Sequence, residues 1–273
     1  MTSSGAPSAG SGAECLLCGG CRLHPVFRKE RWTVFQCATC TNGFLVSSSA
    51  GEALAPPGDW FQRIPEQRGV FRRRWHAIGK ALRGLLYWRG FEARKLRRVL
   101  RWKQGGRLLD IGCAKGEFLS VAQSQFEVQG VEVSPTALQR SRAMFGARVF
   151  SGDVREAGFP DEGFDVITLF STVEHLSDPL AVLRECRRLL RDGGVLVVKT
   201  PNFSSLNRRI LRGGWSGYKL PEHRFFFNPR GLRLLFARAG LEPLPSTWFD
   251  RFPLSDSMYA YAARKGRDGE GRP

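Results

Sequence analysis

The sequence predicts an α/β fold with a parallel sheet and helices on both of its faces. Apolar stretches typical of buried strands alternate with helical patterns between residues 106 and 264. The first of these strands runs into a glycine turn, Asp110 to Gly116, and a helical pattern follows the turn. Acids also stand at or just beyond three successive strands, at Asp110, Glu132 and Asp153. Because the carboxyl ends of parallel strands share one sheet edge, we expect a ligand site there.

The N-terminal 12 residues are rich in Ser, Gly and Ala. They lack the basic start and the apolar segment of a secretory signal. We therefore expect a disordered leader and, with a reducing cytoplasm as the compartment, cysteines that bind metal rather than form disulfides.

Residues 13–48 contain two C-x-x-C pairs separated by 18 residues, a spacing typical of a zinc ribbon. Each pair places two thiolates on one tight turn, and two such turns form a tetrahedral site with no open position. The alternating stretch 31–36 between them predicts a strand. Cys21 and His24 are spare candidates, and free thiols on a loose arm are the alternative. The predicted zinc ligands are Cys15, Cys18, Cys37 and Cys40.

Residues 49–104 form a predicted linker followed by one or two basic amphipathic helices. The stretch 49–60 is rich in Ala, Gly and Pro, and from 61 to 104 apolar residues at mostly helical spacing interleave with groups of Arg and Lys. Two interpretations stay open. The basic face contacts nucleic acid, lipid head groups or a phosphorylated substrate, or the apolar stripe packs on the main domain and the arginines are solvated.

The main domain is expected over residues 105–265, with a frayed tail at 266–273. Ser134–Pro135 and Asn228–Pro229 each predict an N-cap followed by proline at the first helical position, and Gly240 ends the last helix. Predicted strands are 107–111, 129–133, 147–151, 163–170, 195–200, 243–249 and 257–264. Predicted helices are 116–124, 135–145, 179–190 and 229–239. The aromatic run Phe225–Phe227 is predicted to be core.

The acids and the glycine turn indicate the kind of ligand. Gly112 and Gly116 with Ala114 between them depart from G-x-G-x-x-G, which argues against a pyrophosphate loop and for another adenosine-containing cofactor. Glu132 follows Gly112 by about 20 residues, where an acid accepts hydrogen bonds from ribose hydroxyls. Asp153 is placed to reach an adenine amino group. Each acid taken singly could instead cap a helix or a turn.

With these residues the chain resembles the class I S-adenosylmethionine-dependent methyltransferases, over roughly residues 105–241. The resemblance rests on 109–116 (LDIGCAKG), 130–134 (GVEVS), Gly152–Asp153, 163–176, 178–180 (DPL), 189–194 (LLRDGG) and 200–202 (TPN). It implies a Rossmann-like sheet and S-adenosylmethionine as cofactor. Ala114 departs from the family, whose members often have Gly there; Ala is small, so we expect retained binding. The cysteine segment resembles N-terminal zinc segments of some sugar, natural-product and ribosomal RNA methyltransferases.

The resemblance implies a set of cofactor-binding residues. The methionine end would be held by Asp110 and the turn, the ribose by Glu132, and the adenine by Asp153. Phe170, followed by Ser171 and Thr172, would line the methyl-bearing side. The complete predicted set is Asp110, Gly112, Ala114, Gly116, Glu132, Val133, Asp153, Val154 and Phe170.

Two histidines are candidate bases, because an oxygen acceptor must lose its proton and His is the usual base near neutral pH. His175 stands at the end of the fourth strand, and His223 lies between the fifth strand and the last helix. A structural or cofactor-contacting role for His175, and a loop-anchoring hydrogen bond for His223, are the alternatives.

The predicted function is O-methylation of a small molecule or of a glycan- or lipid-linked intermediate. The net charge of +17 allows two others: an RNA methyltransferase or RNA-binding module that uses the ribbon and the arginine-rich helices, and association with an anionic membrane surface. The alternative interpretation of this net charge is a solvated, arginine-rich surface without a specific partner. Ser171-Thr-Val-Glu stands where many base-amino methyltransferases carry Asn/Asp-Pro-Pro-aromatic, which argues against the RNA alternative.

Overall fold

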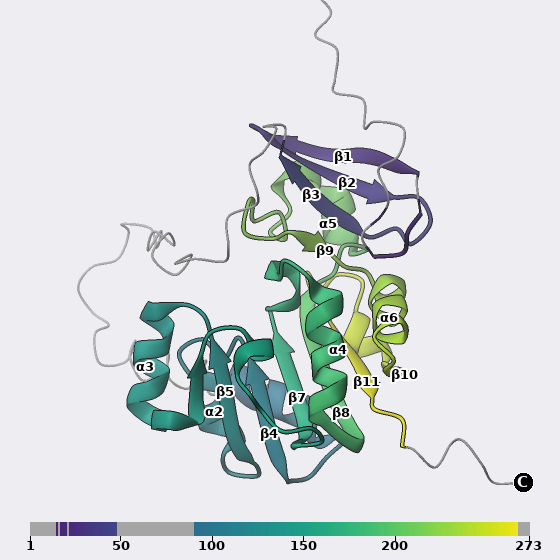
Figure 1. The fold of residues 1–273 in the computed structure, drawn as a ribbon. Helices are drawn as coiled ribbons and strands as arrows, with labels where there is room; N and C mark the ends of the chain where they lie inside the picture. Colours follow the sequence, from purple (N-terminus) through teal and green to yellow (C-terminus); the bar gives the residue numbers. More distant parts are fainter. Residues whose placement is uncertain (1–14, 16, 21, 48–89, 267–273) are drawn as a thin grey trace, which may run out of the picture. The chain divides into compact units, whose positions relative to one another are not determined.

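The computed structural model describes residues 15, 17–20, 22–47 and 90–266 (Figure 1). The predicted leader, the tail from 267 and most of the predicted linker and basic helices lie outside the described residues. Contacts divide the chain into two compact units, which are treated separately below. The first holds described residues of 1–56, 171–187 and 198–263, and the second those of 57–170, 188–197 and 264–273.

Within the described residues, the larger sheet has seven strands in the order β10-β11-β8-β7-β4-β5-β6. Strand β4 pairs in parallel with β5 and β7, and β5 pairs in parallel with β6. The predicted α/β fold is therefore confirmed, except that β10 and β11 are antiparallel. The strands are β4 (Arg107–Ile111), β5 (Glu127–Glu132), β6 (Val149–Ser151), β7 (Phe164–Phe170), β8 (Leu190–Pro201), β10 (Glu242–Leu244) and β11 (Ser257–Ala263).

The second unit places helices beside strands as the sequence predicts. Helices α2 (Glu117–Ala122) and α3 (Pro135–Phe145) follow β4 and β5, and α3 packs against β5 and β6. The Ser134 side chain accepts a hydrogen bond from the Ala137 N–H and so acts as the predicted N-cap. Residues 90–100 are helical and bury Leu96 and Val99, which is the described part of the predicted basic helices.

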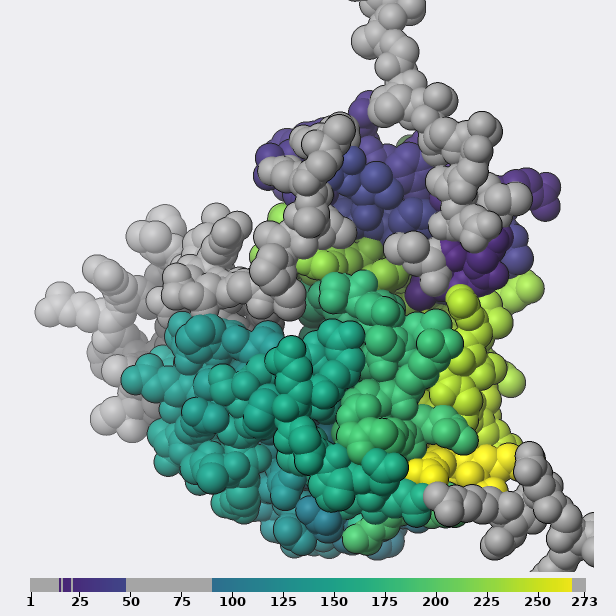
Figure 2. All heavy atoms as spheres, viewed as in Figure 1, coloured from purple at the N-terminus to yellow at the C-terminus, as the bar shows by residue number. Residues whose placement is uncertain are grey.

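The first unit contains a four-stranded antiparallel sheet in the order β1-β2-β3-β9. Its strands are β1 (Leu23–Lys29), β2 (Trp32–Cys37), β3 (Gly43–Ser47) and β9 (Phe225–Phe226). The sequence predicted only the β2 strand of this sheet. Strand β9 comes from the far end of the chain, and in the space-filling view the purple surface of β1–β3 lies directly against light-green residues near it (Figure 2).

An aromatic core stabilises the small sheet. Gly43 allows the close approach, because a Cβ there would lie 2.9 Å from the Phe203 ring. The stacked rings of Phe27 and Tyr218, with centroids 4.2 Å apart, border the core. Phe225–Phe227 is buried, as predicted. The buried members of the cluster are Trp32, Val34, Leu45, Phe203, Trp215 and Phe226.

The remaining α-helices among the described residues are α4 (Pro179–Leu189), α5 (Leu206–Leu211) and α6 (Pro229–Arg238). The predicted strand 243–249 is correct only at residues 243 and 244, because β10 ends at Leu244. Beyond it, Thr247 and Asp250 form a capping box that starts the 3-10 turn η6 (Trp248–Arg251) instead. No helix among the described residues combines the length and apolar character needed to cross a membrane.

We predict that Gly231→Ala destabilises the protein although alanine is the better helix former. A Cβ at residue 231, in the first turn of α6, would collide with the buried Asn42 amide. Overpacking of this kind costs about 1–3 kcal/mol, which outweighs the helix propensity gain of about 1 kcal/mol. The measurement is the free energy of unfolding in denaturant. Gly214→Ala, where a Cβ meets nothing within 4 Å, is the control and should change stability little. Equal values for the two variants would contradict the packing argument.

Candidate functional site

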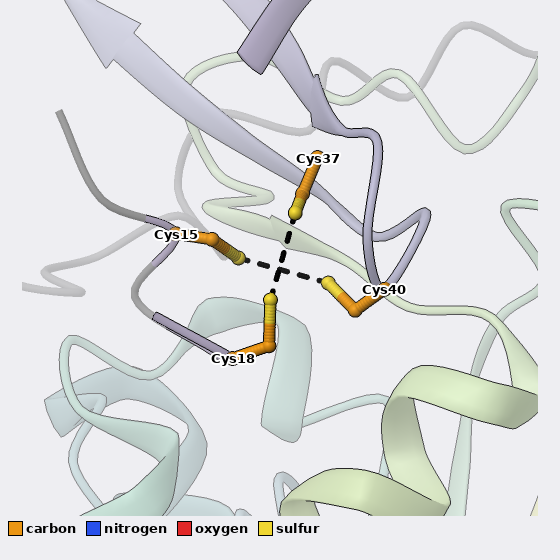
Figure 3. Close-up of side chains that lie close together, drawn as sticks. All are labelled: Cys15, Cys18, Cys37 and Cys40. Atoms are coloured by element: carbon orange, nitrogen blue, oxygen red, sulfur yellow. Dashed lines mark hydrogen bonds between the residues drawn. The ribbon is translucent and has the colours of Figure 1, made fainter. Parts of the chain in front are cut away.

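The four predicted zinc ligands meet at one point (Figure 3). Their sulfur atoms point toward a common centre and all lie within 4.8 Å of one another. The Sγ atoms of Cys15 and Cys40 are 3.6 Å apart, and those of Cys18 and Cys37 are 3.5 Å apart. Tetrahedral zinc with Zn–S bonds of about 2.3 Å requires sulfur atoms about 3.8 Å apart, so the donors fit this ion.

Polar groups around the sulfurs support this fit. The Gly20 and Thr39 N–H groups donate to the sulfurs of Cys18 and Cys37, at 3.4 and 3.3 Å. These backbone donors favour the thiolate form that binds zinc. The hydrogen bond between Cys15 and Cys40 lowers the pKa of Cys15 and raises that of Cys40. Of the spare candidates, His24 is exposed on β1 outside the group, and Cys21 lies outside the described residues.

The predicted glycine turn of the second unit has three alternate residues with left-handed φ. The values are 75° at Gly112, 50° at Ala114 and 81° at Gly116. Glycine adopts this conformation freely, whereas an alanine there costs about 1–2 kcal/mol. The Gly112 N–H donates to the Val131 carbonyl at 2.8 Å, so the turn is tied to the end of β5. A left-handed φ is the physical reason that Gly suits the position of Ala114.

Glu132 is buried and organises the same turn. Its Oε2 accepts from the Ala114 N–H at 2.8 Å, and its Oε1 accepts from the N–H groups of Val133 and Ser134 at 2.9 and 2.8 Å. Burial raises the pKa of Glu132. A carboxylate has about four acceptor positions, so one remains for a ligand hydroxyl.

Asp110 is buried at the end of β4, beside the turn. It accepts a hydrogen bond of 2.6 Å from Thr168 Oγ1, its partner in the register of β4 and β7. Burial raises the pKa of Asp110 to about 7, and the nearby charge of Lys95 opposes that rise. The group is therefore held close to its titration point at neutral pH, where a cationic ligand would favour the carboxylate.

Asp153 is already engaged within the protein. It caps η3 (Val154–Glu156) and pairs with the Arg155 guanidinium through both oxygens, at 2.9 and 2.8 Å. The hydrogen bond from Arg155 lowers the pKa of Asp153, which stays ionised. Of the two valines in the predicted cofactor set, Val154, next to Asp153, is buried, and Val133, which follows β5, is exposed. An adenine amino group would share the Asp153 carboxylate with Arg155.

Lys95 was not singled out by the sequence analysis, which counted it with the basic surface. Its Nζ lies 5.2 Å from the ring centroid of Phe170 and 6.0 Å from that of Phe118. It also pairs with the buried Glu92 at 2.9 Å. The sequence feature that could have predicted this ion pair is the three-residue spacing of Glu92 and Lys95 on a helix. For Thr168, also missed, the signal was a polar residue in the middle of the mostly apolar β7 strand.

The two predicted histidines lie side by side in the first unit. Their ring centroids are 4.7 Å apart at an interplanar angle of 77°. His175 Nδ1 lies 2.9 Å from the Glu222 carbonyl and His223 Nδ1 lies 2.8 Å from the Gly217 carbonyl. Because a carbonyl only accepts, both Nδ1 atoms donate, so in the neutral ring the lone pair is on Nε2.

The environment keeps both rings neutral. Burial lowers the pKa of His175 to about 4 and that of His223 to about 3. Glu174 joins the pair: one ligand atom from each of the three residues lies within 4.8 Å of the others. Glu174 accepts from Thr200 Oγ1 at 2.9 Å, and burial raises the pKa of Glu174 to about 7. Such a set suits proton transfer, and its donors also suit a divalent cation.

Comparison with known proteins was made on sequence and on fold. A family model described as "Methyltransferase domain" matches residues 85–246. The ubiquinone biosynthesis O-methyltransferase of Cereibacter sphaeroides (strain ATCC 17025) is 35% identical over 153 residues, which are 52% of this chain and 62% of that protein. An S-adenosylmethionine-dependent methyltransferase of Mycobacterium tuberculosis is 34% identical over 97 residues, 35% of each chain. The matched part of this chain thus spans less than two thirds of these relatives.

The fold also has solved counterparts. A methyltransferase from Archaeoglobus fulgidus superimposes with a TM-score of 0.52 at 22% identity, over 64% of this chain and 94% of that one. A methyltransferase from Mesorhizobium loti superimposes with a TM-score of 0.51 at 18% identity, over 63% of this chain and 97% of that one. At these identities the likeness concerns the fold alone.

We predict that the protein purifies with about one zinc ion per chain and that Cys40→Ala loses it. The thermal midpoint should fall by about 10 °C, because metal binding contributes to folding. Metal analysis and thermal unfolding provide the measurements. Cys186→Ala removes another buried thiol outside the cluster and should keep the metal. Unchanged zinc in Cys40→Ala would reject the four-cysteine site.

The raised pKa of Asp110 predicts a pH dependence of stability without ligand. The folded state holds this proton up to pH about 7, and the unfolded chain only to about 3.9. The contribution of protonated Asp110 to the free energy of unfolding is therefore fully present at acid pH. It is lost as pH rises from about 4 to 7, with a slope of at most about 1.4 kcal/mol per pH unit. Asp110→Asn keeps an acceptor for Thr168 and should remove this slope. Denaturant unfolding between pH 5 and 7.5 measures it. The exposed Asp161→Asn is the control, and identical slopes in wild type and Asp110→Asn would refute the assignment.

Proposed function

The chain belongs to the methyltransferase-domain family, and on that premise we propose that it transfers a methyl group from S-adenosylmethionine to an oxygen atom of a small molecule or of a glycan- or lipid-linked intermediate. The observation that supports this best is the pair of buried carboxylates, Asp110 and Glu132, on either side of the glycine turn. Burying two carboxylates is costly, and a ligand that presents an ammonium group and ribose hydroxyls would compensate both.

We assign the methionine end of the cofactor to Asp110 and Lys95. That end carries an ammonium group and a carboxylate, and the two side chains carry the complementary charges. Lys95 lies close enough to Asp110 to affect its pKa. The glycine turn beside Asp110 lets the backbone approach the ligand, with Gly112 and Gly116 taking left-handed φ at no cost.

We assign the nucleoside end to the residues after β5 and β6. Glu132 is fixed by three N–H groups and keeps acceptor capacity for the ribose. The exposed Val133 and the buried Val154 offer apolar contact for a purine ring. Asp153 would accept from the adenine amino group while it stays paired with Arg155.

Bound S-adenosylmethionine supplies an activated methyl group on a sulfonium, so the protein's task is positioning and proton removal. His175 and His223 are our candidates for the base. Their lowered pKa values keep both rings unprotonated at neutral pH, and carbonyl bonds at Nδ1 direct the lone pair to Nε2. Glu174, the residue before His175, would accept the proton from the histidine.

The choice of oxygen as acceptor is supported by the relatives whose names specify O-methylation. We propose a structural role for zinc, because four cysteine ligands leave no open coordination position for chemistry.

The test combines cofactor binding with methyl transfer. Calorimetry of the full chain should show saturable one-to-one binding of S-adenosylmethionine, weakened about tenfold to a hundredfold in Asp110→Asn because a charge-assisted contact is lost. With a methyl-labelled cofactor and a small-molecule cell extract, label should enter an extractable product. Replacing the base, in His175→Ala or His223→Ala, should slow this transfer about 10²–10⁴-fold without loss of binding.

His24→Ala, on the exposed face of β1, is the matched control and should transfer label at the wild-type rate. Wild-type rates in both His175→Ala and His223→Ala would reject the base assignment. No saturable binding of S-adenosylmethionine by the wild type would reject the proposed function as a whole.

A further inference from the structure

A cavity in the first unit is lined by three arginines that the proposed methyl transfer does not use. It has a volume of about 540 Å³, in the range of small-molecule sites. Arg230 and Arg233 come from the first turns of α6, and Arg251 comes from the end of η6. Thr41 of the cysteine knuckle and Ser204 after β8 contribute hydroxyl groups to the lining. Four separate segments thus converge on one basic depression.

Among the described residues, no acidic side chain offsets the positive charge of this cavity. In the part of the chain that the structure describes, no carboxylate lies within ion-pair distance of Arg230, Arg233 or Arg251. Arg251 makes only a long 3.5 Å hydrogen bond to the Ser246 carbonyl. The N-terminal end of α6 adds the positive end of its dipole. Three like charges held around one cavity repel each other, and an anion would relieve that repulsion.

The frame that holds these arginines is rigid. Asn228 caps α6 by accepting from the Gly231 N–H at 2.9 Å, and its own N–H donates to the buried Asn42 at 2.9 Å. The start of α6 is therefore anchored to the cysteine knuckle. Arg230 and Arg233 are three residues apart, so they lie on one side of the helix.

A second, smaller cavity of about 180 Å³ adjoins the first, because Pro229, Arg233 and Arg251 line both. Its other walls are mostly apolar or aromatic and include Leu244, Pro245 and Tyr259. The combined site therefore offers a cationic compartment beside an apolar one, with two arginines at the boundary. This arrangement suits a ligand that carries an anionic group on an organic body.

We infer that this double cavity binds a phosphate ester of a small organic molecule. The phosphate lies among Arg230, Arg233 and Arg251, whose planar guanidinium groups match phosphate oxygens in pairs. The organic part packs on Leu244, Pro245 and Tyr259. The inference concerns binding alone and holds whether or not the protein transfers methyl groups.

The test uses the full-length protein, with phenyl phosphate, inorganic phosphate and benzoate as probes in calorimetric titrations. Phenyl phosphate should bind saturably and more tightly than the other two. Arg233→Ala should weaken it about tenfold, which corresponds to one charge-assisted contact. Arg233→Lys should restore only part of the affinity, because the charge returns without the guanidinium fork. Leu244→Ala should weaken phenyl phosphate and leave inorganic phosphate unchanged.

Arg209→Ala is the matched control: it removes the same charge from an exposed position on α5 that does not line either cavity. It should bind phenyl phosphate like the wild type, and thermal unfolding should show all variants folded. An equal loss in Arg209→Ala would mean that overall positive charge attracts the probe, and this overturns the site. Equal affinity for benzoate and phenyl phosphate would overturn the assignment to phosphate.

Discussion

The buried Asn42 and Asn228 join two distant parts of the first unit, and its cysteine segment and helix α6 both depend on their contacts. The two residues are 186 positions apart in the chain, and the Asn228 N–H donates to the Asn42 side chain. Asn42 also donates to the sulfur of Cys40, while Asn228 donates to the Cys40 carbonyl and caps α6. Leaving one such buried group without a partner costs about 1–3 kcal/mol. The cysteine cluster and the start of α6 therefore stabilise each other.

This link changes how the cysteine segment is understood. A ribbon predicted as a separate appendage instead pairs β3 with β9 and shares an aromatic core with Phe203 and Trp215. Zinc at the four cysteines would thus stabilise more than the N-terminal strands. It would also stabilise the frame that carries Arg230 and Arg233, so loss of the metal would affect what the unit binds.

The second unit shows the energetic cost of a prepared site. Asp110 and Glu132 are buried with raised pKa values, and Ala114 holds a left-handed φ. The raised pKa of Asp110 and the left-handed φ of Ala114 each destabilise the ligand-free protein by an amount on the order of 1 kcal/mol or more. Such costs persist where the surrounding strands hold the geometry, here through Thr168 and the backbone of the turn.

Local patterns in the sequence were sufficient for the strands of the large sheet and for the N-caps at Ser134 and Asn228, because periodicity and capping depend on neighbouring residues. The spacing of the two C-x-x-C pairs also predicted that the four cysteines meet. His175 and His223 were predicted as alternative bases, and the structure brings their rings together from two loops, which the sequence did not indicate; their role stays a prediction. Strand β9 escaped prediction because its partner β3 lies far away in the sequence. The pairing of β1 with β2 and the capping box of η6 are local, and their sequence signals were missed. The arginine cavity had no sequence signal at all. Its walls come from four distant segments, and only folding brings their charges and apolar side chains to one place.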